Sequence, residues 1–256
     1  MCELLGISAG KPVDVRNYLK TFYSHSVRHP HGWGLMRASD GAYEIIKEQV
    51  CASGSRILSG VVEKTQPQTN MLAHIRLATV GSVKYDNCHP FSGFDASGRR
   101  WTFMHNGTIY SAGTKLSKYH EEQVGDTDSE RIFLYLMDEL NREIILNDAP
   151  LNTEQRCRLI DRLTASLSPR NKLNLMIFDG EILYVHKNMR DTLVFRETEN
   201  GVILSTAPLD SGTWEDLPMT RLFAYKDGKR VYEGAPHGNE FIPTLEYINA
   251  MAAMNI

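Results

Sequence analysis

Long apolar runs and clustered cysteines are both missing from this chain of 256 residues. The longest apolar runs are short pieces such as Ile144-Ile145-Leu146, far below the roughly 18 consecutive apolar residues that a membrane span needs. The four cysteines are widely spaced, without a Cys-x-x-Cys pair: Cys2, Cys51, Cys88 and Cys157. This spacing argues against a disulfide scaffold and against a zinc cage, and we expect neither a membrane partner nor a bound cofactor.

An excess of one charge is also missing, since 28 Lys+Arg stand against 31 Asp+Glu for a formal net charge of −3. This balance argues against a large basic face, so we expect no nucleic-acid partner. The start, Met1-Cys2-Glu3-Leu4-Leu5-Gly6, has no basic leader followed by an apolar stretch and is not a secretory signal. A cytoplasmic location is therefore expected.

The chain does have enough apolar surface for a packed core, with 42% apolar and 9% aromatic residues. No repeat, low-complexity tract, charge run or linker divides it. We therefore expect one α+β domain over residues 1–256, with largely antiparallel sheet.

Apolar periodicity and turn residues predict many strands and a few long helices. Helices are predicted from Pro12-Val13-Asp14 to near Pro30, after Thr127, and over Thr153–Leu167. Single strands are predicted over Cys2–Ile7, around Leu35, and over Tyr43–Gln49, Asn70–Arg76 and Trp101–Met104, with Ser39-Asp40-Gly41 as the turn between the second and third. Three hairpins are predicted later: Leu173–Phe178 with Ile182–His186, Leu193–Arg196 with Val202–Ser205, and Arg221–Tyr225 with Arg230–Tyr232.

The start of the long central helix carries a capping signal, Thr127-Asp128-Ser129-Glu130. Thr127 and Glu130 are predicted to satisfy first-turn amides reciprocally, as a capping box. Asp126 and Asp128 flank this start, where the helix dipole favours carboxylates. A carboxylate here could instead receive the ammonium group of an amino-acid substrate.

Cys2 becomes the first residue if the initiator Met1 is removed, which places a thiol beside a free α-amine. An α-amino group titrates near about 7.7–8.0, so a sizeable fraction is neutral base at physiological pH and can take the thiol proton. The pair would be a self-contained nucleophile and base. The alternative is a small buried residue in an edge strand.

Arg76 stands at the end of a predicted buried strand, where a guanidinium is costly unless it meets an anion. Its planar fork suits a carboxylate, and Thr79 offers a hydroxyl to the same group. An internal salt bridge is the plainer interpretation of a lone arginine.

Asn106-Gly107 follows another predicted strand, and glycine there lets the backbone approach a bound group. The asparagine NH₂ and the glycine N–H together could form a two-donor oxyanion hole. Alone, Asn-Gly is mostly a turn signal.

Histidines suggest two further sites, and neither pattern is strong. His25, His29 and His31 lie close in sequence, but no carboxylate or cysteine completes a known ligand set, so no metal is expected. Cys88-His89 invites a thiol–imidazole interpretation, but adjacent side chains on an extended segment point to opposite faces. The glycines in His31-Gly32-Trp33-Gly34 indicate a loop packed closely on another part of the chain.

In chain order these motifs resemble the class II glutamine amidotransferase domain, an N-terminal-nucleophile hydrolase. The resemblance covers about the first half of the chain in detail and rests on Cys2 after Met1, Arg76 with Thr79, His89-Pro90, Asn106-Gly107 and Thr127-Asp128-Ser129-Glu130. The start of the chain and His31-Gly32-Trp33-Gly34 look most like the free-standing branch, which has no fused synthase domain and includes the γ-glutamyl hydrolases of the ergothioneine pathway.

The resemblance implies a four-layer αββα sandwich and a role for each matching residue. Cys2 would be the nucleophile and its α-amine the base, while Asn106 and Gly107 would stabilise the oxyanion. Arg76 and Thr79 would hold the substrate α-carboxylate. Asp128 would hold the substrate α-ammonium, and His89 would line the pocket.

The implied reaction is hydrolysis of the γ-amide of L-glutamine or of a γ-glutamyl compound through a thioester on Cys2. Two positions depart from synthase-linked relatives: Val80 stands where they often carry histidine, and His31-Gly32 replaces their Arg-Gly pair. The implied partners are a small-molecule substrate and a synthase or a second copy of the chain.

Other functions remain open at this level. The leaving group could be ammonia or an amine, and the same motifs serve both. A non-catalytic glutamine-binding subunit or sensor is the alternative if Met1 is retained, because the α-amine is then lost as a base. Choloylglycine and penicillin acylases also begin Met-Cys, but Asp14 and Arg16 lie in a predicted helix rather than beyond the first strand. A papain-like Cys–His enzyme would need an internal nucleophile.

Overall fold

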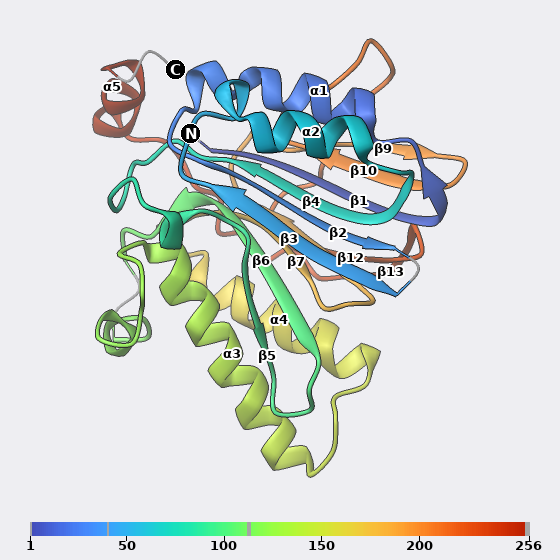
Figure 1. The fold of residues 1–256 in the computed structure, drawn as a ribbon. Helices are drawn as coiled ribbons and strands as arrows, with labels where there is room; N and C mark the ends of the chain where they lie inside the picture. Colours follow the sequence, from blue (N-terminus) through green and yellow to red (C-terminus); the bar gives the residue numbers. More distant parts are fainter. Residues whose placement is uncertain (1, 40, 112–113, 254–256) are drawn as a thin grey trace.

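The computed structural model describes residues 2–39, 41–111 and 114–253 of the chain. Two antiparallel sheets lie face to face, and helices cover the outer face of each (Figure 1). The layers run helix, sheet, sheet, helix, which confirms the four-layer αββα sandwich. In the described part of the chain, no helix is long and apolar enough to cross a membrane.

The first sheet has seven strands in the order β11-β9-β10-β1-β4-β2-β3. Each of its strand pairs is antiparallel. The strand bounds are β1 Glu3–Val13, β2 Trp33–Ser39, β3 Ala42–Glu48, β4 Gln68–Ile75, β9 Val194–Thr198, β10 Gly201–Ser205 and β11 Glu215–Asp216.

The second sheet has six strands in the order β13-β12-β8-β7-β6-β5, again antiparallel throughout. The strand bounds are β5 Phe91–Phe94, β6 Arg100–Thr108, β7 Lys172–Phe178, β8 Leu183–Lys187, β12 Arg221–Lys226 and β13 Lys229–Glu233. The predicted hairpins β7–β8, β9–β10 and β12–β13 are therefore confirmed.

Two helices cover each sheet, and a further one lies near the end of the chain, beyond one end of the sandwich (Figure 1). α1 (Arg16–Ser24) and α2 (Arg56–Lys64) pack on the first sheet. α3 (Asp128–Asn147) and α4 (Thr153–Leu167) pack on the second. The remaining helix is α5 (Leu245–Ala253), and short 3-10 turns span His25–Arg28, Ala52–Gly54, Tyr85–Asn87 and Ser117–His120.

Alternation along the central strands decides which side chains meet between the sheets. On β1, Leu5 packs towards the α1–α2 layer, whereas Leu4 faces the second sheet. On β6, Phe103 packs towards the α3–α4 layer, whereas Met104 faces the first sheet. The period of two therefore places Cys2, just before β1, and Asn106 on inter-sheet faces.

The first strand is longer than predicted, and this corrects the start of the next helix. β1 continues to Val13, so the prediction that Pro12-Val13-Asp14 opens a helix is wrong, and α1 begins at Arg16. Residues 10–12 are exposed, so no alternation of apolar and polar residues reveals this part of the strand. The predicted apolar face of the helix is confirmed, with three buried residues and one partly buried: Val15, Leu19, Phe22 and Tyr18.

The predicted capping box at α3 is half right. Thr127 Oγ1 accepts a hydrogen bond from the Glu130 N–H at 3.2 Å. The Glu130 carboxylate, however, accepts from the N–H groups of Val124 and Gly125 at 2.8 and 2.7 Å. Glu130 therefore fixes the loop that enters the helix, because its side chain is long enough to reach past Thr127.

Four elements were not predicted: α2, β5, β11 and α5. For α2 a signal was present, because Ser55 accepts a hydrogen bond from the Leu58 N–H as its N-cap. The predicted hairpin of β2 and β3 is confirmed by the pairing of Ser39 with Ala42, although Asp40 of its turn lies outside the described residues.

Candidate active site

Cys2 and Arg76 lie side by side at one end of the first sheet. β1 and β4 pair with Glu3 opposite Ile75, so the preceding and following residues, Cys2 and Arg76, continue the same register. Cys2 Sγ lies 3.4 Å from both the backbone N and the carbonyl O of Leu77. The thiol is thus held at the point where β4 turns into a polar loop.

The Cys2 thiol is affected by burial and by nearby positive charge. Burial raises the pKa of the thiol, because a thiolate is poorly solvated between the sheets. The Leu77 N–H and the positive charges of Arg76 and Lys172 act in the opposite direction, since each favours the thiolate. Cationic groups around a cysteine are the usual means of activating it as a nucleophile.

Asn106 and Gly107 lie on β6, in the second sheet. Asn106 pairs with Asn174 of β7, and its side chain is 1% exposed. Its Oδ1 accepts a hydrogen bond from Lys172 Nζ at 3.1 Å, while its Nδ2 has no hydrogen-bond partner among the described residues. A buried amide donor left open in this way is suited to a ligand oxygen.

Gly107 cannot be replaced without a clash. A Cβ at this position would lie 2.0 Å from the Lys172 carbonyl oxygen and 2.2 Å from His105 Nε2. The close approach that the structure shows is to β7, and the predicted approach of a bound group stays a prediction. His105 itself points towards α3, with Nδ1 3.0 Å from Ser129 Oγ.

Arg76 is 2% exposed and donates to backbone carbonyls of the loop that follows it. Its terminal nitrogens lie 2.9 Å from the Ser82 oxygen and 3.1 Å from the Val80 oxygen. Within the described residues no hydrogen bond joins Arg76 to Thr79, which is exposed. The guanidinium thus shapes the loop over residues 77–82, and its predicted contact with a carboxylate stays a prediction.

The two aspartates near the start of α3 have different roles. Asp128 is 4% exposed and accepts from the N–H groups of Ile109 at 2.8 Å and Ser129 at 2.9 Å. Asp126 instead accepts from Ser82, at 3.0 Å from the N–H and 2.8 Å from the hydroxyl. Asp126 therefore ties down the 77–82 loop, and Asp128 joins the start of α3 to the segment that follows Gly107.

His89 lies between the sheets, stacked on His74 with ring centroids 4.2 Å apart. Neither ring has a hydrogen-bond partner in the part of the chain that the structure describes. Burial lowers the pKa of His74 to about 3 and that of His89 well below its ordinary value, so both rings are neutral. The structure thus places His89 against His74, and its predicted contact with substrate stays untested.

The segment His31-Gly32-Trp33-Gly34 does pack closely, as predicted, but Trp33 and Gly34 belong to β2. A Cβ at Gly34 would lie 1.8 Å from the His89 carbonyl oxygen. His31 Nδ1 accepts from the Ala78 N–H at 2.9 Å, which holds the start of the 77–82 loop.

Of the three sequence-neighbouring histidines, His25 and His29 both lie near the Glu3 carboxylate, whereas His31 bonds Ala78. His25 Nδ1 lies 2.8 Å from Glu3 Oε2, and His29 Nδ1 lies 2.9 Å from the His25 carbonyl oxygen. Over residues 2–39, 41–111 and 114–253, no three His, Cys, Asp or Glu side chains gather as metal ligands would.

The sequence did not single out Lys172, which bonds Asn106 and interacts electrostatically with the Cys2 thiol. It is the first residue of β7 and is 1% exposed. Burial lowers the pKa of Lys172 to about 7, and Cys2 acts against that shift. A charged residue directly before the apolar run Leu173–Phe178 was the available signal.

A cavity of about 570 Å³ lies next to these residues. Thr79 and Val80 of the 77–82 loop line it, together with Thr108, two positions after Asn106. Three aromatic side chains also line it: Tyr110, Phe241 and Tyr247. The site therefore has a neighbouring space larger than an amide group needs.

Comparison with known proteins assigns the family. The family model for class II glutamine amidotransferases matches residues 1–199. An uncharacterized protein of Methanocaldococcus jannaschii is 30% identical, over 91% of this chain and 71% of its own length. A Haemophilus influenzae protein, provisionally named a glutamine amidotransferase, is 26% identical, over 91% of this chain and 87% of its own.

Solved structures share the fold. A predicted glutamine amidotransferase of Pseudomonas aeruginosa has a TM-score of 0.65 at 21% identity, covering 90% of this chain and 100% of its own. The glutamine phosphoribosylpyrophosphate amidotransferase of Bacillus subtilis has a TM-score of 0.64 at 16% identity, with 94% of this chain matching 50% of the larger protein. The family match covers most of the chain and includes Cys2, Arg76 and Asn106. The chain therefore belongs to the class II glutamine amidotransferases.

Proposed function

We propose that this protein hydrolyses the γ-amide of L-glutamine or of a γ-glutamyl compound through a γ-glutamyl thioester on Cys2. The observation that carries the proposal is the pairing of two groups across the inter-sheet space. Asn106 has an open, buried Nδ2 donor, and Lys172, which binds its Oδ1, is electrostatically linked to the Cys2 thiol. A nucleophile and an oxyanion donor thus share one neighbour.

The first half of the reaction forms the thioester. After removal of Met1, the Cys2 α-amine takes the thiol proton, and the thiolate attacks the γ-carbonyl carbon. Asn106 Nδ2 and the Gly107 N–H stabilise the resulting oxyanion, a contribution of about 2.7–4 kcal/mol for one such donor in other hydrolases. The Cys2 α-ammonium then protonates the leaving nitrogen, the C–N bond breaks, and ammonia or an amine leaves.

The second half releases glutamate or its derivative. The Cys2 α-amine takes a proton from water as that water attacks the thioester carbon. The same donors stabilise the second oxyanion, which collapses with departure of the Cys2 sulfur. The sulfur recovers its proton, so that the enzyme ends as it began.

The α-groups of the substrate would bind at the two charged residues of the site. We assign the α-carboxylate to Arg76 with Thr79, and the α-ammonium to Asp128. Because Arg76 now donates to the Val80 and Ser82 carbonyls, substrate binding has to share or displace those bonds, so the 77–82 loop would change on binding.

The identity of the leaving group is a separate part of the proposal. The cavity lined by Thr79 and Thr108 supports a leaving amine that carries a substituent, because it provides space for one. A panel of L-glutamine, γ-glutamyl amides and γ-glutamyl peptides, scored for release of glutamate, distinguishes ammonia from larger amines. Free glutamine as the best substrate would support a supply of ammonia to a synthase partner. A preference for substituted amides would support a γ-glutamyl hydrolase.

The decisive test compares Cys2→Ala with wild type. We expect loss of γ-glutamyl hydrolysis in Cys2→Ala, because the variant lacks the nucleophile that forms the thioester. The matched control is Cys51→Ala, since Cys51 is also partly exposed but bonds Ser26 and Ser53 instead. Full activity in Cys2→Ala, or none in processed wild type with any compound of the panel, would remove the enzyme proposal.

A non-catalytic glutamine-binding subunit is the alternative, and it differs at the chain start. Retained Met1 in protein isolated from its native cell, shown by intact-mass spectrometry, would favour it, because Cys2 would then lack a free α-amine. We place the reaction in the cytoplasm, with a synthase or a second copy of this chain as the candidate partner. Co-purification and light scattering test those two partners.

A further inference from the structure

Lys172 is a buried cation that the proposed reaction does not yet use. It opens β7 opposite Thr108, and Thr108 is two residues from Asn106, so all three share the inter-sheet face of the second sheet. Removing an ammonium group from water costs free energy. Lys172 is only 1% exposed, so the folded chain bears that cost. This cost indicates that the group has a function.

The contact with Asn106 has a definite polarity. Lys172 Nζ lies 3.1 Å from Asn106 Oδ1. An amide side chain has one accepting oxygen and one donating NH₂, and an ammonium group can bond only to the oxygen. While it carries its proton, Lys172 therefore decides which way round the Asn106 amide is held.

The opposite side of the same amide carries the open donor. Asn106 Nδ2 is buried and makes no hydrogen bond to any described residue. Rotating the amide by half a turn would bring Nδ2 against the ammonium and turn the oxygen towards the substrate. Such an amide would repel an oxyanion instead of stabilising it.

We propose that Lys172 is a positioning residue that locks the Asn106 amide with Nδ2 directed at the substrate γ-carbonyl oxygen. The inference rests on the proposed function, because it needs Asn106 to act on an oxyanion. It goes beyond that function by assigning a second layer, in which Lys172 acts through Asn106 without touching substrate. Preorganised donors of this kind need fixed orientation before the charge develops.

Lys172→Met tests the proposal through its separate effects on kcat and on KM. The variant keeps the length of the side chain and removes the donor. We expect kcat to fall by about 10- to 100-fold, less than the full loss of an oxyanion donor, with KM within about threefold of wild type. Lys172→Arg retains a donor and should recover part of kcat. Unchanged kcat in Lys172→Met would overturn the proposal.

A double-mutant cycle separates action through Asn106 from a general effect. In an Asn106→Ala background the amide is absent, so Lys172→Met should lower kcat by less than about threefold further. An equal loss in both backgrounds would show that Lys172 acts by another route and would contradict the proposal.

Lys187 supplies the matched control, because it is fully buried on the neighbouring strand β8. Its Nζ donates to the Leu193 carbonyl oxygen at 3.1 Å and pairs with Asp216, away from Cys2 and Asn106. Lys187→Met should keep the kcat of wild type in the folded fraction. A loss equal to that of Lys172→Met would mean that any buried lysine is needed for structure.

One measurement needs neither turnover nor a folded Lys172 variant. The side-chain NH₂ of Asn106, identified in ¹⁵N NMR spectra by its loss in Asn106→Ala, should give one set of signals in wild type. Two exchanging sets would contradict a locked amide. A single set in a wild type that hydrolyses nothing would remove the proposed function and leave the positioning of Asn106 by Lys172 intact.

Discussion

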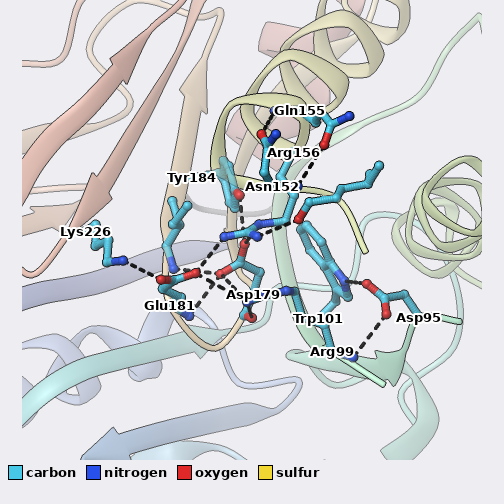
Figure 2. Close-up of polar contacts among 12 residues, drawn as sticks. Asp95, Arg99, Trp101, Asn152, Gln155, Arg156, Asp179, Glu181, Tyr184 and Lys226 are labelled. Carbon is cyan, nitrogen blue, oxygen red and sulfur yellow. Dashed lines mark hydrogen bonds and ion pairs between the residues drawn. The ribbon is translucent and has the colours of Figure 1, made fainter. Parts of the chain in front are cut away.

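Two buried polar regions of this molecule treat charge in different ways. One is the network of Arg156 with Asp179 and Glu181 of the β7–β8 turn, and the other is the site around Cys2 and Lys172. Figure 2 shows the first, where the Arg156 side chain from α4 reaches the carboxylates of Asp179 and Glu181. The two regions lie at opposite ends of β7, since Lys172 opens this strand and Asp179 follows its last residue, Phe178.

In the first region, opposite charges meet directly. Arg156 Nε lies 2.8 Å from Asp179 Oδ2, and Nη2 lies 2.7 Å from Glu181 Oε2. Asp179 also accepts from the Tyr184 hydroxyl at 2.8 Å, and Lys226 pairs with Glu181 (Figure 2). Burial alone would lower the pKa of Arg156, but Asp179 and Tyr184 raise it above its ordinary value.

In the second region, one buried group changes its charge near neutral pH and another keeps a hydrogen-bond donor open. Burial lowers the pKa of Lys172 to about 7, and Asn106 keeps a buried donor open. Polar groups satisfied within the protein stabilise a fold, whereas groups held ready for a ligand serve a reaction and cost stability. The comparison predicts that substitutions in the first region change unfolding, and those in the second change turnover.

The largest expected effect on stability comes from Arg156→Met. It leaves Asp179, whose side chain is fully buried, without its nearest cation. Breaking a buried pair from one side costs about 3–5 kcal/mol. Denaturant unfolding should show this loss, while the kcat of the folded fraction stays at the wild-type value. A large fall in kcat without a change in stability would break the comparison.

Asn106→Ala should give the opposite pattern. Its Nδ2 forms no hydrogen bond within the described residues, so the loss of stability should come from its Oδ1 bond to Lys172 and amount to about 1.5–3 kcal/mol, less than in Arg156→Met. Turnover should fall by about 10²- to 10³-fold, as for other oxyanion-hole donors. Steady-state kinetics and thermal unfolding on the same sample check both halves. Wild-type kcat in this variant would remove Asn106 from the oxyanion hole.

The pH dependence of stability should reveal Lys172. Its folded pKa is about 7, whereas a lysine in the unfolded chain titrates near about 10.4. Between these values the unfolded chain binds more protons, so this group makes the free energy of unfolding rise as pH increases from about 7 to about 10. The Tm of wild type should therefore gain on that of Lys172→Met between pH 7 and 9. Parallel curves would show that burial does not lower the pKa of Lys172.

The smallest effect is expected for Thr127→Ala. The substitution removes the bond from Thr127 Oγ1 to the Glu130 N–H, and loss of an N-cap costs about 1 kcal/mol. Because Asp128 is the next residue, KM should rise more than kcat falls if Asp128 holds the substrate ammonium. Thermal unfolding and the KM for L-glutamine check this, and a change in kcat alone would argue against that role of Asp128.

Much of the fold could be predicted from local patterns. The β7–β8 hairpin and α4 are examples, because a turn of Asp179-Gly180 and a regular apolar face are both local signals. The exposed end of β1 and the reach of Glu130 past Thr127 could not be predicted, since both depend on contacts made only after folding. Helix and strand propensities predict local structure poorly where tertiary contacts determine it.

The candidate site was predictable in its residues but not in its geometry. Cys2, Arg76 and Asn106 each stand at the end of a strand-like run, which is visible in the sequence. Arg76 bonds the carbonyls of Val80 and Ser82 only because the loop folds back on it, so the sequence does not reveal these bonds. Lys172 was missed because a lysine at the start of a strand usually marks a solvated strand end, and here its side chain is buried on the inter-sheet face.

The most direct test of the central claim, that Cys2 carries the reaction, is to trap the thioester. Wild-type protein mixed with a γ-glutamyl substrate is quenched in acid and examined by intact-mass spectrometry and peptide mapping. The account predicts a chain without Met1, heavier by one γ-glutamyl group located on Cys2. A chain that retains Met1, or a γ-glutamyl group on any other residue, would contradict it.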